Sequence, residues 1–402
     1  MGGAMKRMLH PYEVLDFSFE DLCKIMLQML DGSIDACEKV DGTNMTWKSD
    51  LFGSVMFARN QGHIKEGGLG YHAMAELFDN HPAKDQFLEG LNAISNKAAA
   101  ADWVHVLDDV WLNTEIVSSR FPQAFKYDTS ALVIHNAATF INGNVEQYQS
   151  DELKKYIDHL SSKKSGWKVY GRLDMKLEDR LNEGHYDEFV QDIKVLIRET
   201  NPAEADLSIK ISDYVWEEIF MKILALDVVS SNDASSIADS IVKDEVFKWN
   251  HLVPKHNPKY AEFREICIRK NRDKQVNEAL SPLRLIWEKY CAKVLEPLKS
   301  HLIEDITVHR NRMQELIDWN FEELAKRMEN PDTKNDKIVK LWMEYHTHLA
   351  RYKSLGVEPP AIEGIVFKHP KLKNKLLKIT GAFPAINRVV GVVRYGLGLK
   401  KQ

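Results

Sequence analysis

The sequence CEKVDGTNMTW, residues 37–47, has one lysine at the end of a strand-like segment, shortly before an Asp-Gly pair. Asp-Gly between two strand-like segments favours a tight turn, so Lys39 is expected beside a turn. The simplest interpretation of this segment alone is an exposed lysine next to a hairpin, with no chemical role. A lysine amine becomes a nucleophile only when burial or neighbouring cations favour its neutral form.

Short apolar segments separated by Gly, Asn, Asp and Pro predict a strand-rich α+β domain in the first third of the chain. The expected strands cover residues 33–40, 45–50, 54–60, 102–109, 111–118 and 130–141. Helical patterns are few in this part, and they cover residues 18–30 and 69–79.

The pattern changes to helical periodicity over residues 149–354, with many charges and few turn residues. One clear helix begins at Ser281-Pro282, because proline is favoured in the first turn and the following apolar residues share one face. Segments typical of strands then return over residues 361–370 and 375–383. We therefore expect an α+β domain in two parts, residues 1–148 and 355–402, interrupted by a helical insertion.

The composition is that of a soluble globular protein, with 44% hydrophobic and 28% charged residues over 402 positions. No apolar run approaches the roughly 18 residues that a membrane helix needs, so no membrane partner is expected. The four cysteines form no CxxC pair, which argues against a zinc knuckle and against a disulfide framework. A reducing compartment, the cytoplasm, is therefore expected.

The net charge of −5 gives no overall attraction for nucleic acid, so such contact needs a local basic patch. The C-terminal segment offers one, because no acidic residue follows Glu363. Its cations are Lys368, Lys371, Lys373, Lys375, Lys378, Arg388, Arg394, Lys400 and Lys401. We expect this segment to bind phosphate groups.

A pocket holding a nucleoside triphosphate and a divalent metal could activate Lys39. The neutral amine would attack the α-phosphate, and pyrophosphate would leave. Such a transfer depends on cations and metal-binding carboxylates that stabilise charge on the phosphoryl oxygens.

KVDGTN, residues 39–44, resembles the nucleotidyl-lysine motif KxDG of the covalent nucleotidyltransferase superfamily, which includes DNA ligases, RNA ligases and mRNA capping enzymes. Further segments resemble the family's later motifs in the same order. They are ARNQG (58–62), LNTEIV (112–117), EGIVFK (363–368) and LLKITGAF (376–383), the last similar to phage RNA ligases. The resemblance covers roughly residues 34–140 and 355–383 and does not extend to the helices. It implies the family's fold of antiparallel sheets.

The resemblance also implies roles for residues around the nucleotide. Lys39 would be the nucleophile that becomes a lysyl-AMP adduct, with Asp41 and Gly42 forming the turn beside it. Arg59 would contact the sugar or the phosphates, and Glu115 would accept hydrogen bonds from the ribose hydroxyls. Two further nucleotide contacts are implied for Glu38 and Asn44.

The remaining implied roles concern charge. Glu363 would help to hold the catalytic metal, Mg²⁺ with Mn²⁺ as the alternative, through oxygen ligation. Lys368 and Lys378 would neutralise phosphate charge, with Lys378 nearest the α-phosphate. ATP would be the nucleotide substrate.

Three features depart from the family pattern. The strand expected to offer an aromatic ring to adenine reads ALVIHNAATF, which leaves His135 as the stacking side chain. The last strand usually carries two lysines in KxK spacing, but Thr380 follows Lys378 here, unless Lys373 and Lys375 take that register. The chain also ends soon afterwards, which favours an RNA-ligase-like enzyme over those with a further OB-fold domain.

The expected activity is ATP-dependent joining of a 5′-phosphate to a 3′-hydroxyl, with RNA favoured over DNA. A phage-encoded protein of this kind would act in the host cytoplasm. The alternatives are a DNA ligase, a nucleotidyltransferase that modifies a protein, a small molecule or an RNA end, and a non-catalytic nucleic-acid-binding protein. A nicked duplex, a tRNA break and a single-stranded end all remain open as substrates.

Overall fold

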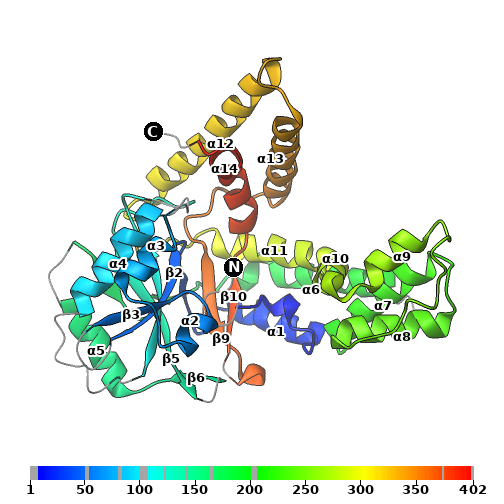
Figure 1. Ribbon diagram of the computed structural model, residues 1–402, viewed down its shortest axis with the longest axis horizontal. Helices are drawn as coiled ribbons and strands as arrows, with labels where there is room; N and C mark the ends of the chain where they lie inside the picture. Colours follow the sequence, from blue (N-terminus) through cyan, green and yellow to red (C-terminus); the bar gives the residue numbers. More distant parts are fainter. Residues whose placement is uncertain are drawn as a thin grey trace.

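The computed structural model describes residues 8–49, 54–79, 84–98, 107, 109–121, 124–141, 144–162, 166–200, 206–373 and 375–399. The chain has a mixed α+β fold whose strands form two sheets, paired antiparallel with one parallel exception. Figure 1 shows the larger sheet beside a small central sheet, with helices extending from the latter. The predicted strand 102–109 lies largely outside the described residues.

The larger sheet has the strand order β3-β2-β4-β5-β6, and β7 pairs with β5 in parallel. Its strands are β2 (Thr43–Ser49), β3 (Val55–Ala58), β4 (Trp111–Val117), β5 (Ala131–Ile141), β6 (Asn144–Tyr148) and β7 (Lys168–Tyr170). Side chains on one face of this sheet pack against three helices. These are α3 (Tyr71–Glu76), α4 (Lys84–Ala98) and α5 (Asp151–Ser162); the short α2 (Gln61–Lys65) follows β3.

The small sheet has the order β10-β9-β1-β8 and joins segments from both ends of the chain. Its strands are β1 (Ala36–Lys39), β8 (Asp174–Met175), β9 (Gly364–Lys368) and β10 (Leu376–Ile379). Because β1 and β2 belong to different sheets, Asp41-Gly42 carries the chain between sheets and does not close a hairpin. The hairpin interpretation is therefore wrong. Long-range pairing partners, which a local turn pattern cannot specify, determine the path.

Most of residues 149–354 are helical, but β7 and β8 show that the sheets take in residues up to 175. The helices beyond that point form two groups. One group is α6 (His185–Thr200), α7 (Ile211–Leu224), α8 (Ser231–Lys243), α9 (Tyr260–Cys267), α10 (Arg272–Ala279) and α11 (Ser281–Leu295), which share a core with α1 (Phe19–Leu30) and one face of the small sheet. The other group is α12 (Ile306–Glu329), α13 (Asp336–Ser354) and α14 (Phe383–Gly396). Single 3₁₀ turns occur at Pro11–Glu13, Leu181–Glu183, Arg269–Asn271 and Pro370–Leu372.

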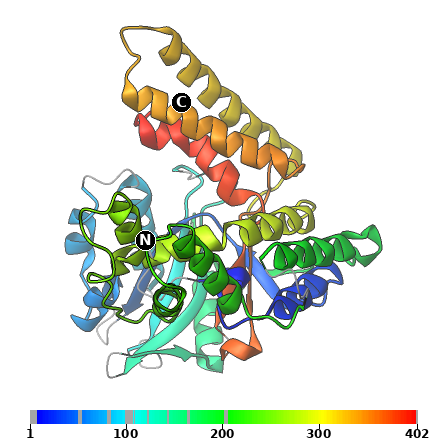
Figure 2. The ribbon, with the colours of Figure 1, turned by 90° about the vertical axis from the view of Figure 1, so that its right-hand side faces the viewer.

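The group α12–α14 stands out from the rest of the molecule (Figure 2). Buried residues recur about every three to four positions in α12 and α13, so each helix has one buried face. These faces pack against α14. The predicted strand over 376–383 is shorter in the structure, because Gly381 turns the chain with a φ of +45° and α14 begins at Phe383. This turn places the start of α14 beside the end of β10.

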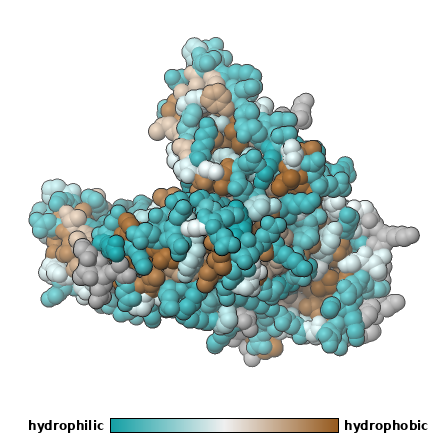
Figure 3. All heavy atoms as spheres, turned by 180° about the vertical axis from the view of Figure 1, so that it is seen from behind, coloured by the Kyte–Doolittle hydropathy of each residue, from teal (hydrophilic) through white to brown (hydrophobic). Residues whose placement is uncertain are grey.

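The surface seen from behind is mostly hydrophilic, with hydrophobic side chains in small separate groups (Figure 3). Within the part of the chain that the structure describes, no helix is both long and apolar enough to cross a membrane.

Candidate active site

Lys39 and Glu363 form an ion pair where β1 ends and β9 begins, the two central strands of the small sheet. Lys39 is the last residue of β1 and lies directly opposite Gly364, the first residue of β9. Its amine contacts Oε1 of Glu363, and the two side chains are only 16% and 10% exposed. Oε2 of Glu363 is buried and has no hydrogen-bond partner within the described residues. Two segments that resemble motifs of one family are thus in direct contact.

Gly364 allows three strands to meet closely at this point. A Cβ atom on Gly364 would lie 2.0 Å from the carbonyl oxygen of Ile379 on β10, far inside van der Waals contact. The absence of a side chain also leaves space on the sheet face between Lys39 on β1 and the end of β10. Packing therefore requires glycine at position 364, directly after Glu363.

Asp41 holds the loop that follows Lys39. Its carboxylate accepts hydrogen bonds from the backbone N–H groups of Ala124 (2.9 Å) and Phe125 (3.0 Å). Its own backbone N–H donates to the hydroxyl of Tyr127 at 2.7 Å. Burial raises the pKa of the Asp41 carboxyl to about 6, although both hydrogen bonds oppose this shift. The loop path is thus fixed by buried polar contacts.

The larger sheet contributes Asn44 and Glu115 from adjacent strands. The two residues are opposite each other in the β2–β4 ladder, and the Asn44 amide lies 3.4 Å from Glu115 Oε2. A Cβ atom on Gly42 would lie 2.8 Å from Cγ of Glu115, so Glu115 packs against the loop after Lys39. The sheet geometry therefore brings Glu115 to the edge of the lysine site, and its expected nucleotide contact stays a prediction.

Arg59 follows β3 and is turned toward the neighbouring strand and helix. Its guanidinium donates to the backbone carbonyl of Asn44 and lies 4.8 Å from the ring centroid of Phe87. Burial lowers the pKa of Arg59 below its ordinary value. In this conformation Arg59 supports β2 and the base of the site.

His135 is the extra residue of a β-bulge on β5. Asn113 pairs with Asn136 and Thr114 with Ile134, so His135 has no opposite residue. Its Nε2 lies 3.5 Å from Glu115 Oε2, and its side chain is 7% exposed. The bulge aims the ring at Glu115, and the adenine-stacking role expected for His135 stays a prediction.

Glu38 leaves the opposite face of β1 from Lys39, because successive side chains of a strand alternate. Its carboxylate accepts from the backbone N–H of His301 at 2.8 Å and from His301 Nδ1 at 2.9 Å. The structure therefore does not bring Glu38 to the lysine site, and its predicted nucleotide contact has no support in this geometry. Sequence reasoning missed His301, because nothing local connects residues so far apart in the chain.

Lys378 lies on the same face of the small sheet as Lys39. It is opposite Val366 on β9, and Val366 is opposite Cys37 on β1, so Lys378 is one row from Lys39. Lys368 is on this face too but is exposed at the far end of β9. Its side chain starts about 13 Å along the strand from Gly364.

The alternative register with Lys373 and Lys375 is not present. Lys373 ends a 3₁₀ turn with a φ of +51°, and Lys375 precedes β10. Lys378 and Thr380 are therefore the residues that β10 directs to the site. Lys400 and Lys401 of the expected basic segment lie outside the described residues.

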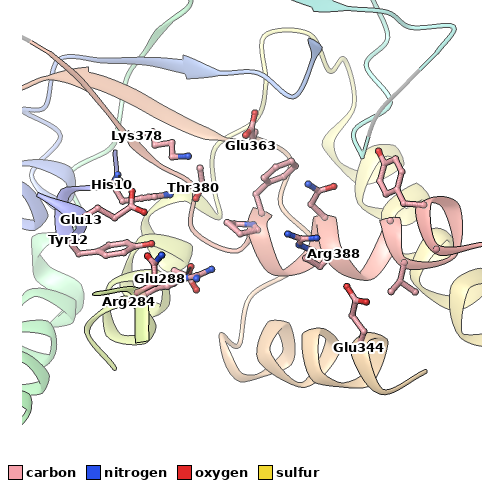
Figure 4. Close-up of a pocket in the computed structure, with 18 of the residues that line it drawn as sticks. His10, Tyr12, Glu13, Arg284, Glu288, Glu344, Glu363, Lys378, Thr380 and Arg388 are labelled. Atoms are coloured by element: carbon pink, nitrogen blue, oxygen red, sulfur yellow. Dashed lines mark hydrogen bonds and ion pairs between the residues drawn. The ribbon is translucent and has the colours of Figure 1, made fainter. Parts of the chain in front are cut away.

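A cavity of about 770 Å³ adjoins this sheet face. Glu363, Lys378 and Thr380 line it together with residues of α11, α13 and α14 (Figure 4). The segment Pro11–Glu13 also borders it, from the N-terminal end of the chain. Space for a ligand is thus continuous with the Lys39–Glu363 pair.

The charge state of the pair follows from its burial. Burial alone lowers the pKa of Lys39, but the neighbouring carboxylates, Glu363 first, outweigh it and hold that pKa above its ordinary value. Burial raises the pKa of Glu363 to about 8, and the Lys39 charge opposes this shift. The amine is therefore protonated near neutral pH, and it must lose a proton before it can act as a nucleophile.

The Glu363 carboxyl group is suited to a magnesium ion that phosphate groups also bind. No group of three or more His, Cys, Asp or Glu side chains arranged for a metal occurs among the residues that the structure describes. Mg²⁺ at nucleotide sites needs only one or two carboxylates, with phosphate oxygens and water as its other ligands. Oε2 of Glu363, buried and without a partner in the described chain, is suited to be such a ligand.

Comparison with known proteins finds no family model that matches the chain and no curated protein that matches it.

Proposed function

We propose that this chain is an ATP-dependent polynucleotide ligase that joins a 5′-phosphate to a 3′-hydroxyl through a lysyl-AMP intermediate, with RNA ends as its substrates. The observation that carries the proposal is the contact between Lys39 and Glu363. The two residues belong to segments that resemble the first and a late motif of covalent nucleotidyltransferases, and their side chains meet in a buried site beside a cavity.

The first step is transfer of AMP to Lys39. The neutral amine attacks the α-phosphorus of ATP, an N–P bond forms, the bond to the β-phosphate oxygen breaks, and pyrophosphate leaves. Glu363 contacts the amine through Oε1, and its ionised form is positioned to take up the proton, because burial raises the pKa of this carboxyl and so its affinity for a proton. Lys378, one row away on the same sheet face, is positioned to neutralise phosphate charge.

Mg²⁺, when bound with ATP, supplies positive charge to the phosphate oxygens, and Glu363 Oε2 is the residue atom that would hold it. A cation beside an amine lowers the pKa of that amine, so Mg²⁺ held by Glu363 would favour the neutral form of Lys39. It would oppose the carboxylates, which raise the pKa of Lys39.

The later steps use the adduct. An oxygen of the 5′-phosphate attacks the phosphorus of lysyl-AMP, the N–P bond breaks, and an adenylated 5′ end is released with the lysine restored. The 3′-hydroxyl then attacks the 5′-phosphorus, a phosphodiester bond forms, and AMP leaves. Lys378, on the sheet face that lines the cavity, is positioned to supply positive charge to these phosphates.

The test is transfer of label from α-labelled ATP to the denatured protein in the presence of Mg²⁺, with GTP in a parallel reaction. Nicked RNA and nicked DNA are then offered to the labelled protein. Sealing of RNA with release of AMP supports the proposal, and sealing of DNA alone favours the DNA ligase alternative. Label from GTP alone redirects the proposal to capping-type chemistry, and label without any joining favours a modifying nucleotidyltransferase.

A further inference from the structure

The cavity beside the lysine site extends away from Lys39 between β10 and α14, beyond the segments that resemble the ligase motifs. Lys378 and Thr380 line its sheet side, and Arg388 lines it from α14 (Figure 4). Arg284 of α11 also lines it, so its walls include helices that the resemblance does not cover. A function for this part of the cavity must therefore be argued from its own residues.

Thr380 is the first indication that a ligand binds here. The residue is 5% exposed, and its Oγ1 has no hydrogen-bond partner among the described residues. Buried polar atoms are normally hydrogen-bonded, so an unpaired hydroxyl at a cavity wall indicates a missing partner. Thr380 follows Lys378 by two positions, and the two side chains therefore lie on one face of the sheet.

The start of α14 is the second feature. Gly381 turns the chain, and α14 begins at Phe383, directly after Thr380 in space and sequence. The helix has 14 residues. Pro384 has no N–H, and the N–H groups of Phe383 and Ile386 donate to the carbonyls of Thr380 and Ala382, so Ala385 provides the first-turn N–H without a partner among the described residues. The N-terminal end of α14 carries partial positive charge, which favours an anion next to the Thr380 hydroxyl.

The charges around the cavity leave one guanidinium for a ligand. Glu288 is paired with Arg284 at 2.8 Å and also with Arg351, so these three neutralise one another in part. Glu13 accepts from the backbone N–H of His10 at 2.8 Å. The carboxylate of Glu344 also lines the cavity, and its partner among the described residues is His348 at 4.0 Å, an imidazole whose pKa burial lowers.

Arg388 differs from Arg284, the other arginine that lines the cavity among the described residues. It is exposed on α14 and forms no ion pair with any described residue. An unpaired guanidinium at a cavity wall is suited to bidentate contact with phosphate oxygens. It is one and a half turns from the N-terminus of α14, so a ligand at that end is within its reach.

We propose that Thr380 Oγ1, the N-terminus of α14 and Arg388 form a phosphate subsite continuous with the lysine site. Its ligand is a phosphate group of the substrate, which is either the pyrophosphate part of ATP or the 5′-phosphate of the nucleic acid. Arg388 supplies from α14 the positive charge that a second lysine supplies in the KxK strand, at the place where this chain has Thr380. This inference rests on the proposed function and extends it.

The test compares Arg388→Ala and Thr380→Val with the unaltered protein and with Lys340→Ala, an exposed cation of α13 outside the cavity. Three reactions are measured: labelling from ATP over a range of ATP concentrations, release of label as ATP when pyrophosphate is added, and transfer of label to RNA with a 5′-phosphate. Loss of a charged hydrogen bond corresponds to roughly a tenfold change or more, and loss of a neutral one to a few-fold change.

A pyrophosphate subsite predicts that Arg388→Ala raises the KM for ATP and slows release of label by pyrophosphate, with transfer to RNA unchanged. A subsite for the nucleic-acid phosphate predicts the reverse: normal labelling and slow transfer. The proposal is overturned if both variants match Lys340→Ala in all three reactions. If neither the unaltered protein nor any variant becomes labelled from ATP, the ligase proposal fails. Calorimetry with inorganic pyrophosphate then tests the subsite alone. Binding that Arg388→Ala weakens would support it, and no binding or unchanged binding would reject it.

Discussion

Lys39 and Glu363 are 324 positions apart in the chain, yet the amine of one contacts the carboxylate of the other where β1 ends and β9 begins. The pairing of β1 with β9 creates this contact, since it sets Lys39 opposite Gly364. A single buried ion pair therefore connects the two halves of the interrupted sheet domain. It also brings the proposed nucleophile, Lys39, into contact with the carboxylate proposed to take up its proton, Glu363.

The rate of Lys39 labelling is expected to rise with pH. The carboxylates around the amine raise its pKa, so only a small neutral fraction exists near pH 7. That fraction, and with it the rate of adduct formation, should increase roughly tenfold per pH unit below the pKa of the nucleotide complex. Single-turnover labelling between pH 6 and 9 measures this. A flat profile would contradict the assignment of Lys39 as an amine that must lose a proton.

Gly364→Ala is expected to disrupt the site through packing. The added Cβ would lie 2.0 Å from the Ile379 carbonyl oxygen, so β9 and β10 must separate. Overpacking of this kind costs about 1–3 kcal/mol of unfolding free energy, and labelling should fall as well. Gly166→Ala, where nothing lies within 4 Å of the new Cβ, is the matched control. Equal thermal stability of the two variants would show that the strands are not so close.

His301→Ala is expected to destabilise the protein, because it removes a contact to Glu38 on the face of β1 opposite to Lys39. The imidazole donates to buried Glu38 at 2.9 Å, and losing a hydrogen bond of this kind costs about 0.5–1.5 kcal/mol. The hydrogen bond to Glu38 raises the pKa of His301 above its unfolded value. Its charge-dependent stabilisation is thus complete below about pH 6.5 and is lost as pH rises through the folded-state pKa.

Denaturant unfolding at pH 5.5 and at pH 9 checks this, with His251→Ala, an exposed histidine, as the control. The destabilisation by His301→Ala should be larger at pH 5.5. A difference that grows toward pH 9 would have the wrong sign for a histidine stabilised in its charged form.

Asp41→Asn is expected to change how stability depends on pH. The folded pKa of Asp41, about 6, lies above the ordinary aspartate value of 3.8, so ionisation of this group favours the unfolded chain. The stability difference between the native protein and Asp41→Asn should therefore shift against the native protein as pH rises from 4 to 7, by at most about 3 kcal/mol. Parallel urea titrations measure it, and a constant difference across this range would refute the raised pKa.

Much of this arrangement was predictable from the sequence where motifs and periodicity act together. The order of KVDGTN, LNTEIV and EGIVFK predicts that strands from both ends of the chain share one domain, and β1 and β9 do pair. The apolar stripe of the helix beginning at Ser281 predicts its buried face, and Trp287 and Tyr290 are buried there. These features follow from local chemistry repeated at regular spacing.

Other features depend on contacts that no local pattern encodes. The Asp-Gly turn was expected beside a hairpin, but the pairing partners of β1 and β2 lie in different sheets. β7 and β8 have three and two residues, too few for an alternating pattern to be recognised. Alternation along β1 separates Glu38 from Lys39, yet which of them faces the cavity depends on helices hundreds of residues away.

The central claim is that Lys39 forms a covalent bond to AMP. The direct measurement is intact-protein and peptide mass spectrometry after incubation with ATP and Mg²⁺, with Lys39→Ala, Lys39→Arg and Lys340→Ala alongside. Lys39→Arg keeps the positive charge beside Glu363 but removes the nucleophilic amine. The account predicts one added AMP on the Lys39 peptide of the native protein and of Lys340→Ala, and none on either Lys39 variant. An adduct on another residue, or no adduct in protein first stripped of bound nucleotide, would contradict it.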